Sequence, residues 1–452
     1  MASVSRPNIL FLFTDDQRFD AVGALGNPEV ITPNMDRLVE KGTTFTHATI
    51  QGSICPAVSL PSRAMLMTGR NLYHAPRDCG DFVTLPQHLQ AHGYTTFGTG
   101  KWHNQPSSYA RSFSDGGKIF YGGMSNHLEV PVYDFHPDGE YPEEDRYVGK
   151  EFSSELFSDT AIDFLRRCPD DSPFMAYVSY TAPHDPRMAP KEFEDLYDPA
   201  RVTVPENFCP VHPFDNGEMV IRDEMLAPFP RTPEVVQEHI AAYYAMITHL
   251  DAHIGRVLEA LEETGRADDT IVVFAGDNGL AVGQHGLMGK QNMYDHSIRV
   301  PLVMTGPGIP EGARSDALCY LLDVFPTLCE MTDLPTPASV EGRSLAPIVR
   351  GEAANAPYDS LFFAYMDCQR AIRDDRWKLV EYFGPAERVT QLFDLAADPW
   401  ETANLAATPD MEEQLTRLRG ELAAWQERID DPMAGQIDAG TAAQAHRENP
   451  EP

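Results

Sequence analysis

The chain has 452 residues, 42% of them hydrophobic and 23% charged, and its formal net charge is −33 at pH 7. This composition is typical of a globular protein, and the length suffices for one large α/β domain and a smaller one. The strongly negative charge argues against nucleic acids and anionic membrane surfaces as partners, because both would be repelled. No stretch approaches the ~20 apolar residues that a membrane-spanning helix requires.

Targeting signals and metal-binding cysteine motifs are not visible in the sequence. The seven cysteines are scattered without paired CxxC spacing, which argues against a zinc site and a dense disulfide framework. No signal peptide precedes the first predicted strand. We therefore expect a cytoplasmic protein, or a periplasmic or secreted one if a leader has been removed.

The first element is a continuous apolar run at residues 8–13, which predicts a buried parallel strand. It ends at Asp15 and Asp16, where α/β sheets place their ligands. Two adjacent carboxylates repel one another unless a cation lies between them, so we interpret the pair as metal ligands. A solvated turn is the alternative.

Helices and strands then alternate, which predicts a mostly parallel sheet. The predicted elements are a helix at 32–42, a strand at 43–48, a helix ending at Gly69, a helix at 85–93 and a strand at 94–99. Pro61 suits the first turn of the helix that ends at Gly69. Ser59 therefore lies at a helix N-terminus, and Arg63 follows one turn later. A hydroxyl and a guanidinium in these positions are well placed to bind a tetrahedral oxyanion. An ordinary helix start with Arg63 in solvent is the alternative.

Two short segments at strand ends contain candidate catalytic side chains. Lys101 and His103 follow the strand at 94–99, and in extended backbone both would point to the same face. His184 follows the predicted strand at 174–180 and is flanked by prolines, which would hold its imidazole as a general acid. The alternatives are that Lys101 and His103 are ordinary surface residues and that His184 is an ordinary loop histidine.

A second set of oxygen ligands follows the predicted strand at 270–275. Asp277 and Asn278 lie in a tight turn there, which by itself is only a turn signal. Opposite Asp15 and Asp16 they would complete an all-oxygen site, which suits Ca²⁺ more than Mg²⁺.

The remaining segments define the expected domains. Residues 105–147 lose periodicity and predict an irregular insertion that shapes a binding site, and helices are expected at 156–167 and 233–264. Short strands at 361–365, 370–373, 377–382 and 391–395 predict an antiparallel sheet, with a final helix at about 410–428. We expect a catalytic domain at 1–340, a C-terminal subdomain at 341–433 and a polar tail at 434–452.

The central pattern, Ser59-x-Pro-Ser-Arg63-x-x-x-Met-Thr-Gly-Arg70, resembles the signature of the type I sulfatases of the alkaline-phosphatase superfamily. Similar family motifs are the Asp pair, Gly-Lys-Trp-His and Ala-Pro-His, and Lys290 matches a catalytic lysine of the family. These resemblances follow in order along nearly the whole chain. In that family the first signature residue, Cys or Ser, is oxidised to formylglycine. The register identifies Ser59 as this residue rather than Cys55. The sequence fits both a natural serine at the modification site and a serine that replaces a natural cysteine there.

The resemblance implies an alkaline-phosphatase-like α/β fold: a large, mostly parallel sheet flanked by helices, with the smaller antiparallel C-terminal sheet. It also implies that a formylglycine-generating enzyme acts during maturation and that the gem-diol of residue 59 attacks sulfur while bound to the metal. Arg63, Lys101 and Lys290 would stabilise negative charge. His184, alone or together with Lys290, would protonate the leaving alcohol, and His103 would accept the remaining gem-diol proton. The implied metal site consists of Asp15, Asp16, Ser59, Asp277 and Asn278.

The substrate is the least determined feature. The polar insertion and a second candidate rim at residues 366–370 favour a sulfated carbohydrate, small or oligomeric, over a lipid or steroid sulfate. The candidate contacts are His127, Arg187 and Arg370. The alternative is that these residues only pack the lid. A phosphodiesterase or phosphonate monoester hydrolase of the same superfamily remains an alternative. So does a sulfate-ester binding protein without turnover, if Ser59 is not oxidised.

Overall fold

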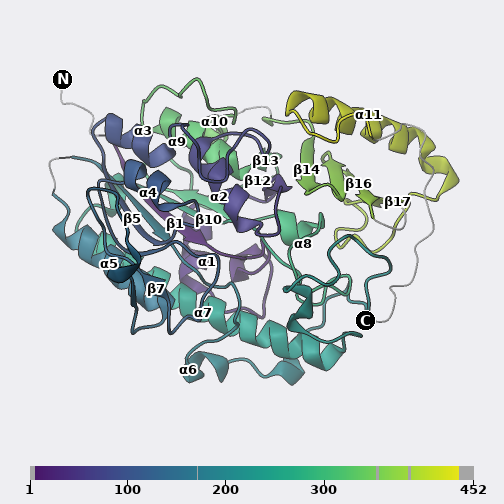
Figure 1. Cartoon of the computed structure of the whole chain (residues 1–452), viewed down its shortest axis with the longest axis horizontal. Coiled ribbons are helices and arrows are strands. Elements are labelled where there is room, and N and C mark those ends of the chain that lie inside the picture. The colour runs from purple at the N-terminus through teal and green to yellow at the C-terminus, as the bar shows by residue number, and fades with distance from the viewer. Residues whose placement is uncertain (1–5, 170–171, 353–355, 385–387, 437–452) are drawn as a thin grey trace.

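The computed structural model describes residues 6–169, 172–352, 356–384 and 388–436 (Figure 1). Most of the predicted polar tail, residues 437–452, lies outside the described residues. Among the described residues, no helix is both long and apolar enough to cross a membrane.

A large mixed sheet forms the centre of the molecule, in the strand order β12-β2-β11-β10-β1-β9-β5-β6. Its pairings are parallel except for the two that β11 makes, with β10 and β2, so the predicted mostly parallel sheet is confirmed. Its strands are β1 (Asn8–Thr14), β2 (Gly42–Phe45), β5 (Thr95–Lys101), β6 (Asp115–Phe120), β9 (Phe174–Ser179), β10 (Thr270–Gly276), β11 (Leu302–Thr305) and β12 (Ala313–Ser315).

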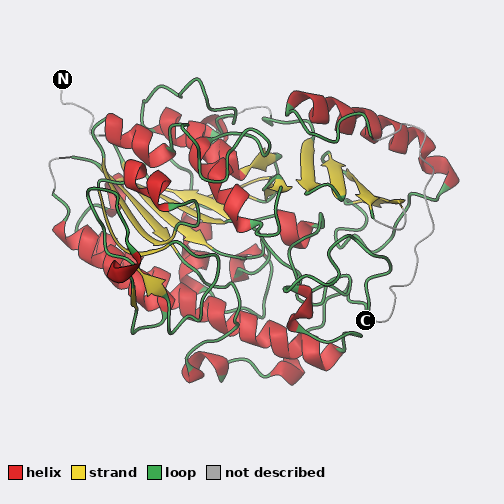
Figure 2. Cartoon of the chain, viewed as in Figure 1, coloured by secondary structure: helices red, strands yellow, loops and turns green. Residues whose placement is uncertain are grey.

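Helices cover both faces of this sheet (Figure 2). Alternate side chains of β1 point to opposite faces, so Phe11 packs into one apolar core and Leu12 into the other. The Leu12 core contains α1 (Pro33–Lys41), α5 (Ser153–Arg167), α6 (Lys191–Glu194) and α7 (Pro233–Glu263). The Phe11 core contains α2 (Ser59–Thr68), α3 (Leu85–Ala91), α4 (Pro106–Ser112), α9 (Val324–Met331) and α10 (Ala346–Val349). Burial of both faces explains why the strands read as continuous apolar runs.

Two sequence-based expectations about strands were wrong. The segment predicted as one strand at 43–48 is divided between β2 and β3 (Ala48–Thr49), which pairs with β13 (Cys319–Tyr320). The insertion at 105–147 is not wholly irregular, because it contains α4, the edge strand β6, and a small ribbon of β7 (Pro131–Val132) and β8 (Tyr147–Val148). Strand β6 begins Asp-Gly-Gly-Lys, residues of low β-propensity, so its pairing with β5 depends on the neighbouring strand rather than on its own composition.

The C-terminal sheet has the predicted antiparallel meander and one unexpected strand. Strands β14 (Leu361–Tyr365), β15 (Gln369–Arg373), β16 (Trp377–Phe383) and β17 (Arg388–Asp394) pair in order, and α11 (Glu412–Arg428) packs on them. Strand β4 (Gly52–Ser53) joins β14 in parallel. A side chain at Gly52 would approach the Ala364 carbonyl oxygen to 2.0 Å, so only glycine allows this pairing. The C-terminal sheet is therefore attached to the segment that immediately precedes Ser59.

The remaining short helices are α8 (Asp295–Ile298) and the 3₁₀ turns η1 (Gly23–Leu25), η2 (Glu143–Asp145), η3 (Pro199–Arg201), η4 (Glu224–Leu226), η5 (Ala267–Asp269), η6 (Leu321–Asp323) and η7 (Pro409–Met411).

Candidate active site

Ser59 is the first residue of α2, and its side chain faces two other predicted site residues. Its Oγ lies 3.2 Å from Lys101 Nζ and 3.2 Å from His103 Nδ1. The helix ends at Gly69, whose φ of 64° is the left-handed conformation that glycine adopts easily. Arg63 is 1% exposed, which excludes the alternative in which it lies in solvent.

Lys101 and His103 meet at Ser59 for a reason that the sequence did not predict. Lys101 is the last residue of β5, whereas His103 lies beyond the strand with a φ of 69°. The two side chains therefore do not follow the alternation of one extended strand. A turn in the left-handed region directs the imidazole back toward Ser59.

Two strand ends bring the predicted oxygen ligands together. Strands β1 and β10 are adjacent and parallel, with Thr14 opposite Gly276, so the residues after each strand emerge side by side. The carboxylate oxygens of Asp15, Asp16 and Asp277 lie within 4.8 Å of one another, and all three residues are buried. The Asp16 backbone N–H also donates to Asp277 Oδ1 at 3.0 Å.

Each of these carboxylates has a cationic partner. Lys101 Nζ lies 2.6 Å from Asp15 Oδ2. Arg63 Nη2 lies 2.9 Å from Asp277 Oδ2, and its Nε donates to the same oxygen at 2.9 Å. Lys290 Nζ lies 2.7 Å from Asp16 Oδ1. The negative charges of the three carboxylates therefore equal the positive charges of the three cationic side chains. Charges that are removed from water require neutralisation of this kind.

The donor set fits a hard divalent cation. Asp15 Oδ1 and Asn278 Oδ1 are buried and have no hydrogen-bond partner among the described residues, although such atoms are normally satisfied. Burial, together with the charge of Asp15, raises the pKa of Asp277 to about 7. A bound cation would occupy the unsatisfied oxygens and lower that pKa, and all-oxygen ligands suit calcium or magnesium.

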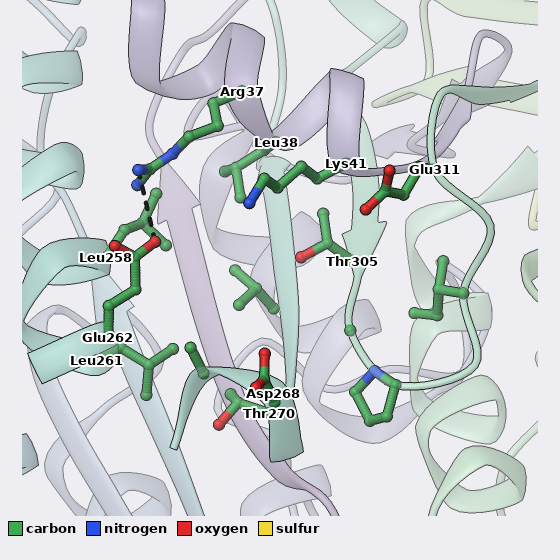
Figure 3. Close-up of a pocket in the computed structure, with 15 residues that line it drawn as sticks. Arg37, Leu38, Lys41, Leu258, Leu261, Glu262, Asp268, Thr270, Thr305 and Glu311 are labelled. Atoms are coloured by element: carbon green, nitrogen blue, oxygen red, sulfur yellow. Dashed lines mark ion pairs between the residues drawn. The ribbon is translucent and has the colours of Figure 1, made fainter. Parts of the chain in front are cut away.

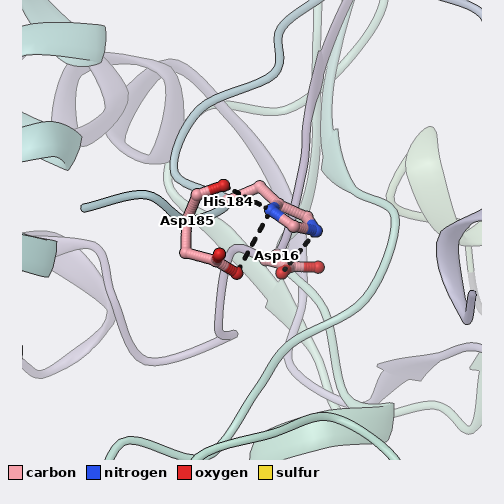
Figure 4. Close-up of side chains that lie close together, drawn as sticks. All are labelled: Asp16, His184 and Asp185. Carbon is pink, nitrogen blue, oxygen red and sulfur yellow. Dashed lines mark hydrogen bonds and ion pairs between the residues drawn. The ribbon is translucent and has the colours of Figure 1, made fainter. Parts of the chain in front are cut away.

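His184 lies between Asp16, a member of the carboxylate cluster, and Asp185 (Figure 4). Its Nδ1 lies 2.8 Å from the Asp185 carbonyl oxygen, which fixes a proton on Nδ1, and its Nε2 lies 3.6 Å from Asp16 Oδ2. Burial, with the charges of Lys290 and Lys101, lowers the pKa of His184 despite the opposing charge of Asp16. The pKa of His103 is also lowered, by burial and by Lys101, so His103 is a neutral imidazole that can accept a proton.

The three candidate substrate contacts lie in other environments. His127 is buried, with Nδ1 2.7 Å from Ser153 Oγ and Nε2 2.8 Å from the His184 carbonyl oxygen, so it supports the backbone of the His184 loop. Arg187 Nη1 lies 2.6 Å from His239 Nδ1. Arg370 belongs to strand β15 of the C-terminal sheet, is fully buried, and pairs with Asp431 through two bonds of 2.7 and 2.8 Å. Their substrate roles stay predictions.

A cavity of about 220 Å³ opens above Ser59. Lys290, His103 and His184 face it together with segments that carried no sequence signal. It is lined by Pro56, Ala57, Ser59, His103, Gly123, Met124, His184, Ile221, Arg222, Asp223, Lys290 and Gln291. Residues 221–223 belong to a proline-rich loop whose composition predicts a connection but no function, so only the folded chain identifies them.

A larger hollow of about 330 Å³ lies at the opposite end of the sheet (Figure 3). It is lined by Thr270 at the start of β10, Thr305 at the end of β11, and an ion pair of 3.5 Å between Arg37 and Glu262. Parallel α/β sheets bind ligands at the carboxyl ends of their strands, and this hollow lies at the other end of β10. We therefore assign the chemistry to the cavity above Ser59.

Comparisons with known proteins show the family to which the chain is similar. Residues 7–334 match the family described as sulfatase, and residues 283–428 match the family described as N-sulphoglucosamine sulphohydrolase, C-terminal. The chain is 28% identical to an ulvan-active sulfatase of Formosa agariphila over 92% of this chain and 80% of that protein. It is 27% identical to an N-acetylglucosamine-6-O-sulfatase of Bacteroides thetaiotaomicron over 88% of this chain and 82% of that protein. The fold also resembles that of BT4656, which was solved in complex with its substrate D-glucosamine-2-N,6-O-disulfate. The TM-score is 0.80 and the sequence identity is 24%, over 96% of this chain and 100% of that chain.

Proposed function

Because the chain belongs to the sulfatase family, and is thereby a sulfuric ester hydrolase, we propose that it releases sulfate from a sulfated carbohydrate by means of formylglycine at position 59. The observation that supports this proposal best is the position of Ser59. Its Oγ lies at a helix N-terminus, within 3.2 Å of both a lysine and an imidazole. That lysine also pairs with Asp15, one of the three clustered buried carboxylates. An unmodified serine has only one hydroxyl and could not expel sulfate after transfer, whereas a hydrated aldehyde has two.

We propose that Asp15, Asp16, Asp277 and Asn278 hold a divalent cation, Ca²⁺ or Mg²⁺, together with residue 59. When bound, this cation would lower the pKa of the nucleophile and neutralise sulfate oxygens. The protein side chains alone are electrically balanced, so a divalent cation gives the site a charge of +2. That excess positive charge explains how an acidic protein can attract an anionic ester.

The cationic side chains have different roles in this proposal. Lys101 donates to the oxygen of residue 59, and Lys290 lines the cavity where a sulfate group would lie. Both can stabilise negative charge that develops during transfer. Arg63 is not among the cavity-lining residues. Its guanidinium donates to Asp277 and to Ser179 Oγ, at 2.6 Å, so we assign it the role of fixing a metal ligand.

The two histidines provide the proton transfers. His103 is neutral and lies 3.2 Å from the oxygen of residue 59, so it can accept the proton that must leave when sulfate is expelled. His184 faces the same cavity and is held by the Asp185 carbonyl oxygen. We propose that its Nε2 delivers a proton to the leaving alcohol after receiving one from solvent.

A carbohydrate substrate is supported by two relatives whose names state their substrates, ulvan and N-acetylglucosamine 6-O-sulfate. The cavity offers a mixture of polar and apolar side chains, as sugar sites do. The proposed boundary near residue 340 separates the part with all of these site residues from the C-terminal subdomain.

Intact mass and sulfate release together test this function. Oxidation of Ser59 to formylglycine removes two hydrogens, a loss of about 2 Da. Converted protein should release sulfate from a sulfated monosaccharide, and unconverted protein should bind the ester without turnover. If conversion does not occur in the expression host, a Ser59→Cys variant matured by a formylglycine-generating enzyme replaces the wild type. Faster turnover of a matched phosphonate monoester would instead favour the phosphonate hydrolase alternative.

A further inference from the structure

We propose that Arg222, held between Asp185 and Asp223, forms a rim that binds the neutral hydroxyl groups of the substrate next to the sulfate and disfavours a second anionic group there. This inference rests on the proposed sulfatase function and specifies its substrate. The three residues are referred to below as the rim triad.

The rim triad lies at the mouth of the catalytic cavity. Arg222 and Asp223 line the cavity directly, together with Ser59 and Lys290. Asp185 is adjacent to His184, another lining residue. A substrate whose sulfate group reaches residue 59 would therefore have its sugar ring at the level of the rim triad.

The guanidinium is fixed by its neighbours but still accessible. Arg222 Nη1 donates to Asp185 Oδ2 at 2.6 Å, and Nη2 donates to Asp185 Oδ1 at 2.9 Å and to Asp223 Oδ1 at 2.6 Å. The Arg222 side chain is 45% exposed, whereas those of Asp185 and Asp223 are 7% and 12% exposed. These bonds use three of the five N–H donors of arginine, so two donors remain for a ligand.

The surrounding loop is rigidly supported, which a specificity element requires. Gln291 Nε2 donates to Asp223 Oδ2 at 2.7 Å. Glu224, the next residue, accepts the backbone N–H groups of Met288 and Gly289 at 2.9 Å each. Gln369 of the C-terminal sheet donates to the Gln291 carbonyl oxygen at 3.0 Å. The rim triad is thus locked to the segment that contains Lys290.

The charge of the rim triad determines the ligand chemistry. One guanidinium and two carboxylates sum to −1, in contrast to the positive site below when a divalent cation is bound. A second sulfate or a carboxylate beside the rim would be repelled by the two aspartates. A hydroxyl group avoids this repulsion because it can accept from Arg222 and donate to a carboxylate at the same time. The rim triad therefore suits a sugar ring with one sulfate and free neighbouring hydroxyls.

The test uses converted full-length enzyme and three substrates: a hexose monosulfate, the same hexose with a second sulfate, and an aryl sulfate without ring hydroxyls. We expect wild type to prefer the monosulfate over the disulfate by at least about tenfold in kcat/KM. Arg222→Gln should reduce the sugar-to-aryl ratio of kcat/KM by about tenfold or more, mainly through KM, since a hydrogen bond to a charged group is worth roughly that factor. Asp223→Asn should reduce the discrimination against the disulfate.

Arg201→Gln provides the matched control, because Arg201 is exposed and lies outside the cavity. It should leave both ratios unchanged. Equal turnover of monosulfate and disulfate by wild type, or an unchanged sugar-to-aryl ratio in Arg222→Gln, would overturn the inference while leaving the sulfatase function intact. Failure of wild type to turn over any sulfate ester would instead contradict the proposed function. Far-ultraviolet circular dichroism and thermal unfolding show whether each variant is folded.

Discussion

Asp277 is the residue at which metal binding and stability can be separated most clearly. It accepts a hydrogen bond of 2.9 Å from Nε of Arg63 and forms an ion pair of 2.9 Å with Nη2 of the same residue. Arg63 is 1% exposed, and Asp277 is one of three clustered carboxylates. Asp277→Ala removes the partner of a buried guanidinium, which should destabilise the metal-free protein by about 3–5 kcal/mol. Asp277→Asn keeps an acceptor oxygen of similar shape, so we expect a smaller loss of about 1–3 kcal/mol.

Calcium should affect the two variants differently from the wild type. At a free calcium concentration 100 times the dissociation constant, a ligand that binds only the folded state stabilises it by about 2.7 kcal/mol. Wild type should show this gain, and both variants should lose most of it because one of three anionic ligands is missing. Urea unfolding in EDTA and in calcium chloride measures both quantities.

Two results would refute this reasoning about Asp277. If Asp277→Ala were as stable as the wild type in EDTA, burial of the Arg63 guanidinium would not depend on its pairing with this carboxylate. A full calcium gain in Asp277→Asn would show that Asp277 is not a metal ligand. Asp410→Asn, a change at an exposed carboxylate remote from the cluster, should leave both measurements at wild-type values.

Three further predictions follow from particular contacts. In converted enzyme, Ser59→Ala should abolish sulfate release while Cys55→Ala retains most of it, and activity that depends on Cys55 would show that the register of the signature is wrong. Arg370→Met should lower the free energy of unfolding, measured by urea denaturation, by about 3–5 kcal/mol, because it leaves Asp431 buried without its partner at 2.7 Å. Burial raises the pKa of Glu401 to about 7. The folded state therefore binds more protons than the unfolded state between about pH 4.5 and 7. As a consequence, the contribution of Glu401 to the free energy of unfolding falls as pH rises through that range. Glu401→Gln should therefore flatten the decrease in urea midpoint over this range, and an unchanged pH profile would contradict the assignment.

The sequence alone predicted the elements that depend on local pattern. Apolar runs identified β1, β9 and β10 because both faces of these strands are buried, and the run at β1 ends at Asp15. Helix and strand alternation predicted a mostly parallel sheet, but only the fold makes β10 the neighbour of β1 and thereby brings Asp277 to Asp15. The residues around Ser59 predicted helix α2, which is observed at Ser59–Thr68.

Tertiary structure alone decided the features that depend on contacts between distant segments. Strand β6, with its glycines and aspartate, is a strand only because β5 lies beside it, and β4 is a strand only because β14 does. His103 faces Ser59 through a left-handed turn that periodicity does not encode. The rim residue Arg222 lies in a loop without any pattern, and its position above Ser59 results from ion pairs with Asp185 and Asp223 rather than from local propensity. Hydrophobic periodicity reports which face of an element is buried, whereas the partners of buried charges are fixed only when the whole chain has folded.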